Sequence, residues 1–102
     1  MNNNKLLSFL GLCRRAGKMT IGNDAVIEAM ISGESCLVLL AEDASQRTAK
    51  DIMETAQKNN IQIVRLSYDK QQISRALGKL TAVISINEAG FAKKIIELTG
   101  NE

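Results

Sequence analysis

Residues 22–43 of the chain read GNDAVIEAMISGESCLVLLAED. An amphipathic segment begins after Gly22 and stops at Gly33, where a glycine is typical of a helix end. The apolar run over residues 36–41 follows, and its length and its Leu and Val content are typical of a strand covered on both faces. This stretch therefore predicts a helix, a turn and a buried strand, as in a sheet flanked by helices.

The same alternation extends outward to both ends of the chain. Hydrophobic spacing and turn residues predict helices over 5–16, 22–33, 43–60, 69–78 and 87–100, and strands over 18–21, 36–41, 61–66 and 82–86. Asp69 and Gln72 form a predicted capping box, and Asn87 is the predicted cap of the last helix. The expected core positions on the helices include Leu6, Phe9, Leu10, Cys13, Val26, Ala29, Met30, Ala49, Ile52, Met53, Ala56, Ile73, Ala76, Leu77, Phe91, Ile95, Ile96 and Leu98. The pattern predicts an α/β fold: one domain, residues 1–102, forming a three-layer α/β/α sandwich around a four-stranded mixed sheet.

Composition excludes several classes of protein. The 102 residues are 45% hydrophobic, enough for one small core, and no apolar run approaches the roughly 20 residues of a membrane span. We expect a cytoplasmic protein without a membrane partner. Cys13 and Cys36 lack CxxC spacing, and the chain has no histidine, so we expect two reduced, buried thiols and neither a metal nor another cofactor.

Charge is unevenly distributed although the net charge is only +2. Residues 1–23 carry four basic residues and no acid, residues 24–54 carry seven acids against two bases, and residues 55–79 are again basic. If the two basic blocks meet in the fold, they form a basic face opposite an acidic one. The alternative is that these charges are simply solvated around the surface.

Catalytic chemistry has little support. Without histidine, the acid–base candidates are carboxylates and lysines, such as Glu42, Asp43 and Lys70, and none pairs with a nucleophile. Asp43 follows a buried strand, where it is either a ligand-facing acid or a helix cap. No phosphate-binding glycine motif occurs. We therefore expect no enzyme; one acting on a small acidic ligand near Lys70 would have no motif behind it.

Nucleic-acid binding fits the residues better. The aromatic residues are only Phe9, Phe91 and Tyr68, which is too few for base stacking, so recognition would be polar. A helix starting at Asn23 and Asp24 offers backbone N–H groups to phosphate and side chains to base edges. Asn23 is also explained by helix capping alone.

Five motifs, taken in order, carry a family resemblance over nearly the whole chain. They are LGLCRRAGK (10–18), residues 22–33, LVLLAED (37–43), KQQISRALGK (70–79) and GFA (90–92). Together they resemble the kink-turn RNA-binding ribosomal proteins of L7Ae and L30e type, in their small bacterial branch. The resemblance implies an L30e-like sandwich that clamps a sharply bent RNA at tandem sheared G·A pairs.

The resemblance also implies a set of RNA contacts. Gly22 matches the family's glycine, Lys18 its upstream backbone-contacting lysine, and Lys70 the lysine near the flipped-out nucleotide, while Lys79-Leu80-Thr81 matches its variable loop. The family pattern has Asn, Glu and a following Lys where this chain has Asp24, Ala25 and Glu28. Asn23-Asp24 would match Asn-Glu only after a slip of one residue. Thr20 and Ile21 replace basic residues that often precede the glycine.

These changes predict an altered RNA preference. Asp24 accepts from guanine amino groups but cannot donate, and Glu28 repels phosphate. The affinity should then come mainly from Lys18, Lys70, Arg75 and Lys79.

Taken together, residues and resemblance predict a non-enzymatic, ribosome-associated, monomeric protein whose partner is kink-turn RNA, such as ribosomal RNA. The alternative is a protein-interaction module on the same fold with a degenerate RNA site. The predicted RNA-binding residues are Lys18, Gly22, Asn23, Asp24, Lys70, Arg75, Lys79, Leu80 and Thr81.

Overall fold

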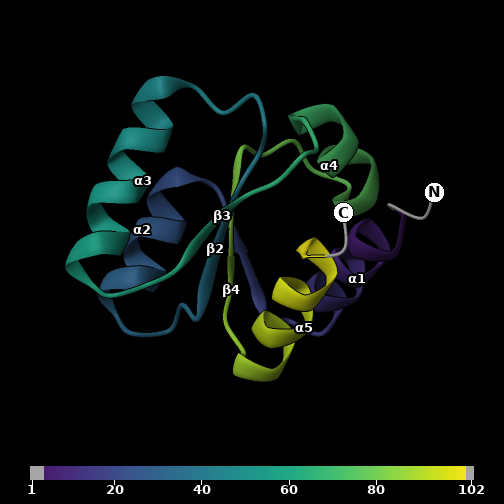
Figure 1. The fold of residues 1–102 in the computed structure, drawn as a ribbon, viewed down its shortest axis with the longest axis horizontal. Helices are drawn as coiled ribbons and strands as arrows, with labels where there is room; N and C mark the ends of the chain where they lie inside the picture. The colour runs from purple at the N-terminus through teal and green to yellow at the C-terminus, as the bar shows by residue number, and fades with distance from the viewer. Residues whose placement is uncertain (1–3, 101–102) are drawn as a thin grey trace.

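Helices and strands alternate through residues 4–100, the part of the chain that the computed structural model describes (Figure 1). The helices are α1 (Asn4–Arg15), α2 (Asn23–Ile31), α3 (Gln46–Lys58), α4 (Lys70–Leu77) and α5 (Ala89–Thr99). The strands are β1 (Met19–Ile21), β2 (Leu37–Leu40), β3 (Ile63–Arg65) and β4 (Val83–Ile86). Each element overlaps the range expected from the sequence. No helix within residues 4–100 is long and apolar enough to cross a membrane.

The four strands form a mixed sheet, as predicted, and they lie in the order β1-β4-β2-β3. β4 is antiparallel to both β1 and β2, whereas β2 and β3 are parallel. In register, Ile21 lies opposite Ile84, and Leu40 lies opposite both Val83 and Arg65. The carboxyl ends of β1, β2 and β3 therefore meet the amino end of β4 at one edge of the sheet. We call it the Gly22 edge, after the residue that follows β1.

Helices cover both faces of the sheet, with α1, α4 and α5 on one face and α2 and α3 on the other (Figure 1). The central strand β2 shows this most clearly because all four of its side chains are buried. Leu37 and Leu39 pack into the core beneath α1, α4 and α5, whereas Val38 and Leu40 pack beneath α2 and α3. The predicted two-sided strand and three-layer sandwich are thus confirmed.

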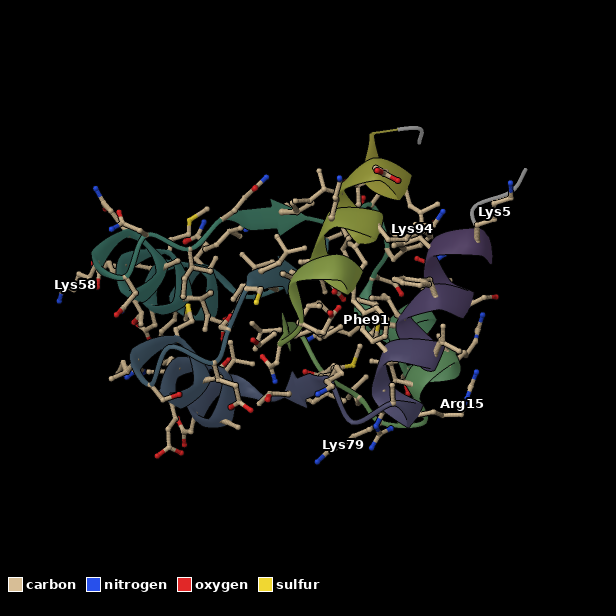
Figure 2. The ribbon with its side chains drawn as sticks, turned by 90° about the horizontal axis from the view of Figure 1, so that it is seen from below. Lys5, Arg15, Lys58, Lys79, Phe91 and Lys94 are labelled. Carbon is tan, nitrogen blue, oxygen red and sulfur yellow. The ribbon has the colours of Figure 1, made fainter. Side chains whose placement is uncertain are left out.

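The two phenylalanines join α1 to α5. The rings of Phe9 and Phe91 meet edge to face, with centroids 5.6 Å apart and an interplanar angle of 88°. Both side chains are partly buried against the core (Phe91 is labelled in Figure 2). Both rings pack against the core, as expected from the sequence.

Two predicted core side chains face solvent instead. Met53 on α3 is 49% exposed and Ile96 on α5 is 37% exposed. Each directly follows a fully buried isoleucine, Ile52 or Ile95, and one helical step turns the next side chain by about 100°. Ile52 and Ile95 therefore point into the core, and the residue after each of them lies at the margin of the apolar stripe.

The predicted cap of α5 is also wrong. Glu88, not Asn87, is the N-cap, and its carboxylate accepts a hydrogen bond from Phe91 N–H at 2.6 Å. Asn87 turns toward the sheet, where its amide donates to Thr20 Oγ1 at 2.8 Å and its carbonyl accepts from Ser85 Oγ at 2.7 Å. The Ser85 hydroxyl also lies 2.7 Å from Ser35 Oγ, so Asn87 links this buried pair of hydroxyls to Thr20 on β1.

The two cysteines differ, which corrects the expectation that both are buried. Cys13 is fully buried within α1, whereas Cys36 is exposed just before β2. Burial raises the pKa of the Cys13 thiol to about 11, because desolvation disfavours the thiolate. Cys36 precedes the two-sided part of the strand, so no helix covers it.

A thiol reagent at pH 8 should therefore label one cysteine of the native protein at Cys36 and leave Cys13 intact, since the thiolate is the reactive form. Counting labelled sites by mass spectrometry checks this, and Cys36→Ser should abolish native labelling. The interpretation is wrong if Cys13 reacts at a comparable rate before denaturant is added.

Candidate nucleic-acid interface

Backbone hydrogen bonds hold the elements of the Gly22 edge together. The Gly22 N–H donates to Val83 O at 3.3 Å, and the Ala41 N–H donates to Ala82 O at 2.9 Å. The start of α2, which begins at Asn23, therefore lies beside the segment that leads from α4 into β4. Residues far apart in the sequence thus share one surface.

The start of α2 leaves its first N–H groups without a side-chain cap. Gly22 is the N-cap, at φ 100° and ψ 151°, and its carbonyl accepts from Val26 N–H at 2.9 Å. This left-handed conformation favours glycine. The side chains of Asn23 and Asp24 are both exposed at the surface. Asn23 also donates from its amide to Thr48 Oγ1 at 3.4 Å, which links it to α3.

Two separate sets of hydrogen bonds hold the start of α4 in place. The predicted capping box is present, with Asp69 accepting from Gln72 N–H at 2.8 Å and Gln72 accepting in return from Asp69 N–H at 2.9 Å. In addition, Asp43 Oδ1 accepts from Lys70 N–H at 3.0 Å. Asp43 thus caps α4, while Ser45 caps its own helix, α3. Lys70 is thereby held at the Gly22 edge.

Replacing Asp43 by Ala should lower the free energy of unfolding by about 0.5–2 kcal/mol, the usual effect of losing a helix cap. Asp43→Asn keeps an acceptor oxygen and is the matched control, with a smaller loss. Urea unfolding followed by circular dichroism measures both. Equal losses in the two variants would mean that the negative charge, rather than the hydrogen bond, is what matters.

The loop after α4 presents one part of the predicted triplet and buries another. Gly78, at φ 79°, ends α4, and the next residues, Lys79 and Leu80, are exposed, Leu80 by 62%. Thr81 is buried; its hydroxyl donates to Val83 O at 2.7 Å and accepts from Val83 N–H at 3.2 Å. Thr81 therefore shapes the loop, and its side chain is not presented at the surface.

Two predicted residues lie away from the Gly22 edge. The Lys18 carbonyl accepts from Asn87 N–H at 2.9 Å, and Asn87 follows the carboxyl end of β4, so Lys18 lies at the opposite edge of the sheet. Arg75 lies on the exposed side of α4, where it lines a groove with Arg15 of α1. Arg15 is not among the predicted RNA-binding residues, because the packing of α1 against α4, which brings Arg15 and Arg75 to one groove, is not visible in the sequence.

Charge follows the layers of the sandwich. The layer of α1, α4 and α5, with the loop after α4, carries Lys5, Arg14, Arg15, Lys70, Arg75, Lys79, Lys93 and Lys94 against Asp69, Glu88 and Glu97. The layer of α2 and α3 carries Asp24, Glu28, Glu34, Asp51 and Glu54 against Arg47, Lys50 and Lys58. The predicted basic and acidic faces therefore exist, although Lys58 on α3 and Arg65 at the end of β3 lie outside the basic layer. Among residues 4–100, no group of His, Cys, Asp and Glu side chains is arranged to hold a metal ion.

Comparison with known proteins gives consistent matches. Residues 4–96 match the model of the "Ribosomal protein L7Ae/L30e/S12e/Gadd45 family". The chain is 34% identical over 90 residues to "RNA-binding protein YlxQ" of Bacillus subtilis (strain 168), covering 87% of this chain and 89% of the relative. It is 31% identical over 97 residues to the protein of the same name from Enterococcus faecium, covering 95% and 93%.

Two solved structures share the fold. One is a protein of unknown function from Bacillus halodurans, with a TM-score of 0.88, 33% identity, and coverage of 94% of this chain and 97% of the other. The second is the 15.5kD RNA binding protein of Giardia lamblia, with a TM-score of 0.77, 19% identity, and coverage of 94% and 82%. At that identity, the second match bears on the fold alone.

Proposed function

The chain belongs to the ribosomal protein L7Ae/L30e/S12e/Gadd45 family, and we propose that it binds structured RNA of the kink-turn type at the Gly22 edge. One observation carries the proposal: the uncapped start of α2, the start of α4 with Lys70, and the exposed loop residues Lys79 and Leu80 converge at this edge. The names of the two curated relatives, both RNA-binding proteins, support it. The role is one of binding and not of catalysis.

Backbone N–H groups and side chains would make different contacts with the RNA. The first N–H groups of α2 and the positive end of its dipole favour a phosphate or another acceptor. Lys70 and Lys79 neutralise backbone phosphates on either side of the bend. Asn23 can donate and accept at base edges, whereas the Asp24 carboxylate accepts from guanine amino groups. Leu80 offers an apolar contact to an unstacked base.

Acidic residues on α2 shape the preference. Asp24 and Glu28 lie four residues apart on the exposed side of α2, where the family pattern has a cation at the second position. A carboxylate at this position repels phosphate, so the RNA should contact α2 only at its first turn. Affinity at this edge then depends on Lys70 and Lys79, because Lys18 lies at the opposite edge of the sheet.

The family match also bears on the RNA target and on where the protein acts in the cell. The family description names ribosomal proteins, which supports a structured ribosomal RNA as the target and a cytoplasmic, ribosome-associated role. We propose a single domain acting as a monomer without a cofactor.

The test compares a kink-turn RNA with the same RNA in which Watson–Crick pairs replace the G·A pairs, at matched moderate salt. We expect the replacement to weaken binding at least tenfold, since it removes the bend that the Gly22 edge is shaped to hold. Equal affinities would contradict kink-turn recognition. An absence of binding to both would contradict RNA binding for this class of target.

A second candidate function is protein interaction through the layer of α2 and α3, called here the acidic layer because it carries more acidic than basic residues. Ile31 is 65% exposed on α2, and Met53 is exposed on α3, so this layer presents apolar side chains among its carboxylates. Purification from cell extract with and without nuclease separates the two candidates. Loss of every partner after nuclease treatment would contradict the protein-interaction function.

A further inference from the structure

A groove of about 610 Å³ runs between α1 and α4, outside the Gly22 edge. The Arg15 and Arg75 side chains line it, together with the polar side chains of Ser8 and Gln72. Of the described residues that line the groove, none is acidic. Figure 2 shows Arg15 on the side of the molecule that holds α1 and α5, far from Lys58 on α3. The groove is therefore a basic site separate from the surface of α2.

Close packing of the two helices brings the arginines together. A Cβ at Gly11 would lie 3.4 Å from Ala76 O and 3.5 Å from Arg15 Nη1, both ordinary contact distances, so Gly11 lies directly against α4 and the Arg15 guanidinium lies beside it. Arg14 donates from Nη1 to the Leu77 carbonyl, which holds the end of α4 against α1. Arg14 is thus used by the fold, whereas Arg15 is directed into the groove.

The arrangement favours an anion. Within residues 4–100, the side chains of Arg15 and Arg75 form no hydrogen bond or ion pair with another residue. Two like charges facing one groove repel each other, and a bound anion offsets that repulsion. Guanidinium groups also match phosphate geometry, because each can donate two parallel N–H bonds. The Ser8 hydroxyl adds a donor of the kind that commonly contacts phosphate.

Helix α4 connects this groove to the Gly22 edge. Lys70 begins the helix at that edge, and Arg75 lies five residues later, about 7.5 Å along the axis. Five residues also turn the helix to a position about 140° around its axis, so a strand of RNA leaving Lys70 would cross the exposed side of α4 at Gln72 to reach Arg75. This continuity favours an RNA backbone over a small free anion.

We propose that the groove between α1 and α4 binds the phosphate backbone of the RNA stem next to the bend, with Arg15 and Arg75 as its phosphate contacts. The inference rests on the proposed function, since the same RNA occupies both surfaces. The groove adds an RNA contact on α1, and this contact is to phosphates and not to the edges of bases. Its contribution is therefore independent of the G·A pairs and requires a stem long enough to reach the groove.

The experiment measures the affinity of R15Q/R75Q for two kink-turn RNAs, one with a full stem and one with the stem cut short beside the bend. On the full stem, affinity should fall at least fivefold, and the slope of log K against log salt should become shallower by about 1.8, or 0.9 for each lost contact. On the short stem, the variant should match the wild type. Discrimination against RNA without G·A pairs should persist on both.

The controls separate charge from fold and from the proposed function. K50Q/K58Q removes two cations from α3 and should leave both RNAs bound as by the wild type, while R15K/R75K should restore the salt slope. An unchanged slope in R15Q/R75Q, or an equal loss on both RNAs, would overturn this inference alone. Wild-type protein that fails to bind, or that ignores the G·A pairs, would overturn the proposed function and the inference with it.

Discussion

Replacing Leu39 by Ala should lower the free energy of unfolding by about 2–5 kcal/mol, the range found for buried leucines. Leu39 is fully buried in β2, which has strands on both sides and helices on both faces. The truncation loses the transfer free energy of the removed atoms and leaves a cavity. Strands hydrogen-bonded on both sides cannot readily move to fill it.

Urea unfolding of Leu39→Ala beside Leu80→Ala tests this expectation. The control removes the same atoms from a side chain that is 62% exposed, so its stability should stay within about 0.5 kcal/mol of the wild type. A loss at Leu80 equal to that at Leu39 would mean that the center of the sheet is not the main source of stability.

Replacing Lys70 and Lys79 by Gln should make the salt dependence of kink-turn RNA binding shallower by about 1.4–1.8, at 0.7–0.9 for each lost phosphate contact. Affinity at moderate salt should fall at least tenfold, because these are the two cations that we propose contact the RNA backbone at the Gly22 edge. Lys70 is positioned by the caps of α4, and Lys79 by the loop that ends in Thr81. Loss of the side-chain charge should therefore leave the backbone of the site unchanged.

Matched substitutions on the acidic layer complete that test. Lys50→Gln with Lys58→Gln changes the net charge equally on α3, and the salt slope should stay at its wild-type value. Titrations of labelled RNA at four salt concentrations give the slopes. Equal decreases in the two pairs would show that net charge, and not the Gly22 edge, sets the affinity.

Most of the fold was predictable because its signals are local. The all-apolar run of β2, the glycines after α1 and α2 and the Asp69–Gln72 capping box each fix an element without knowledge of its neighbours. The errors occur where tertiary contacts decide. Asn87 turns inward, where it bonds Ser85 and Thr20, rather than capping α5.

The candidate site was predictable in part for the same reason. Gly22 and Lys70 mark the ends of elements, and the sheet brings those ends together. Thr81 was expected at the surface, but its hydroxyl is drawn into the turn before β4. The cap that Asp43 provides for α4 spans 27 residues of sequence, and no local pattern indicates it.

The most direct test of the central proposal, RNA binding at the Gly22 edge, is a ¹H–¹⁵N correlation spectrum of the labelled protein titrated with kink-turn RNA. The largest changes should fall at the first turn of α2, at Lys70 and its neighbours, and at Lys79 and Leu80. Smaller changes are expected at Arg15 and Arg75. Changes centred on α3, or none at saturating RNA, would contradict the account.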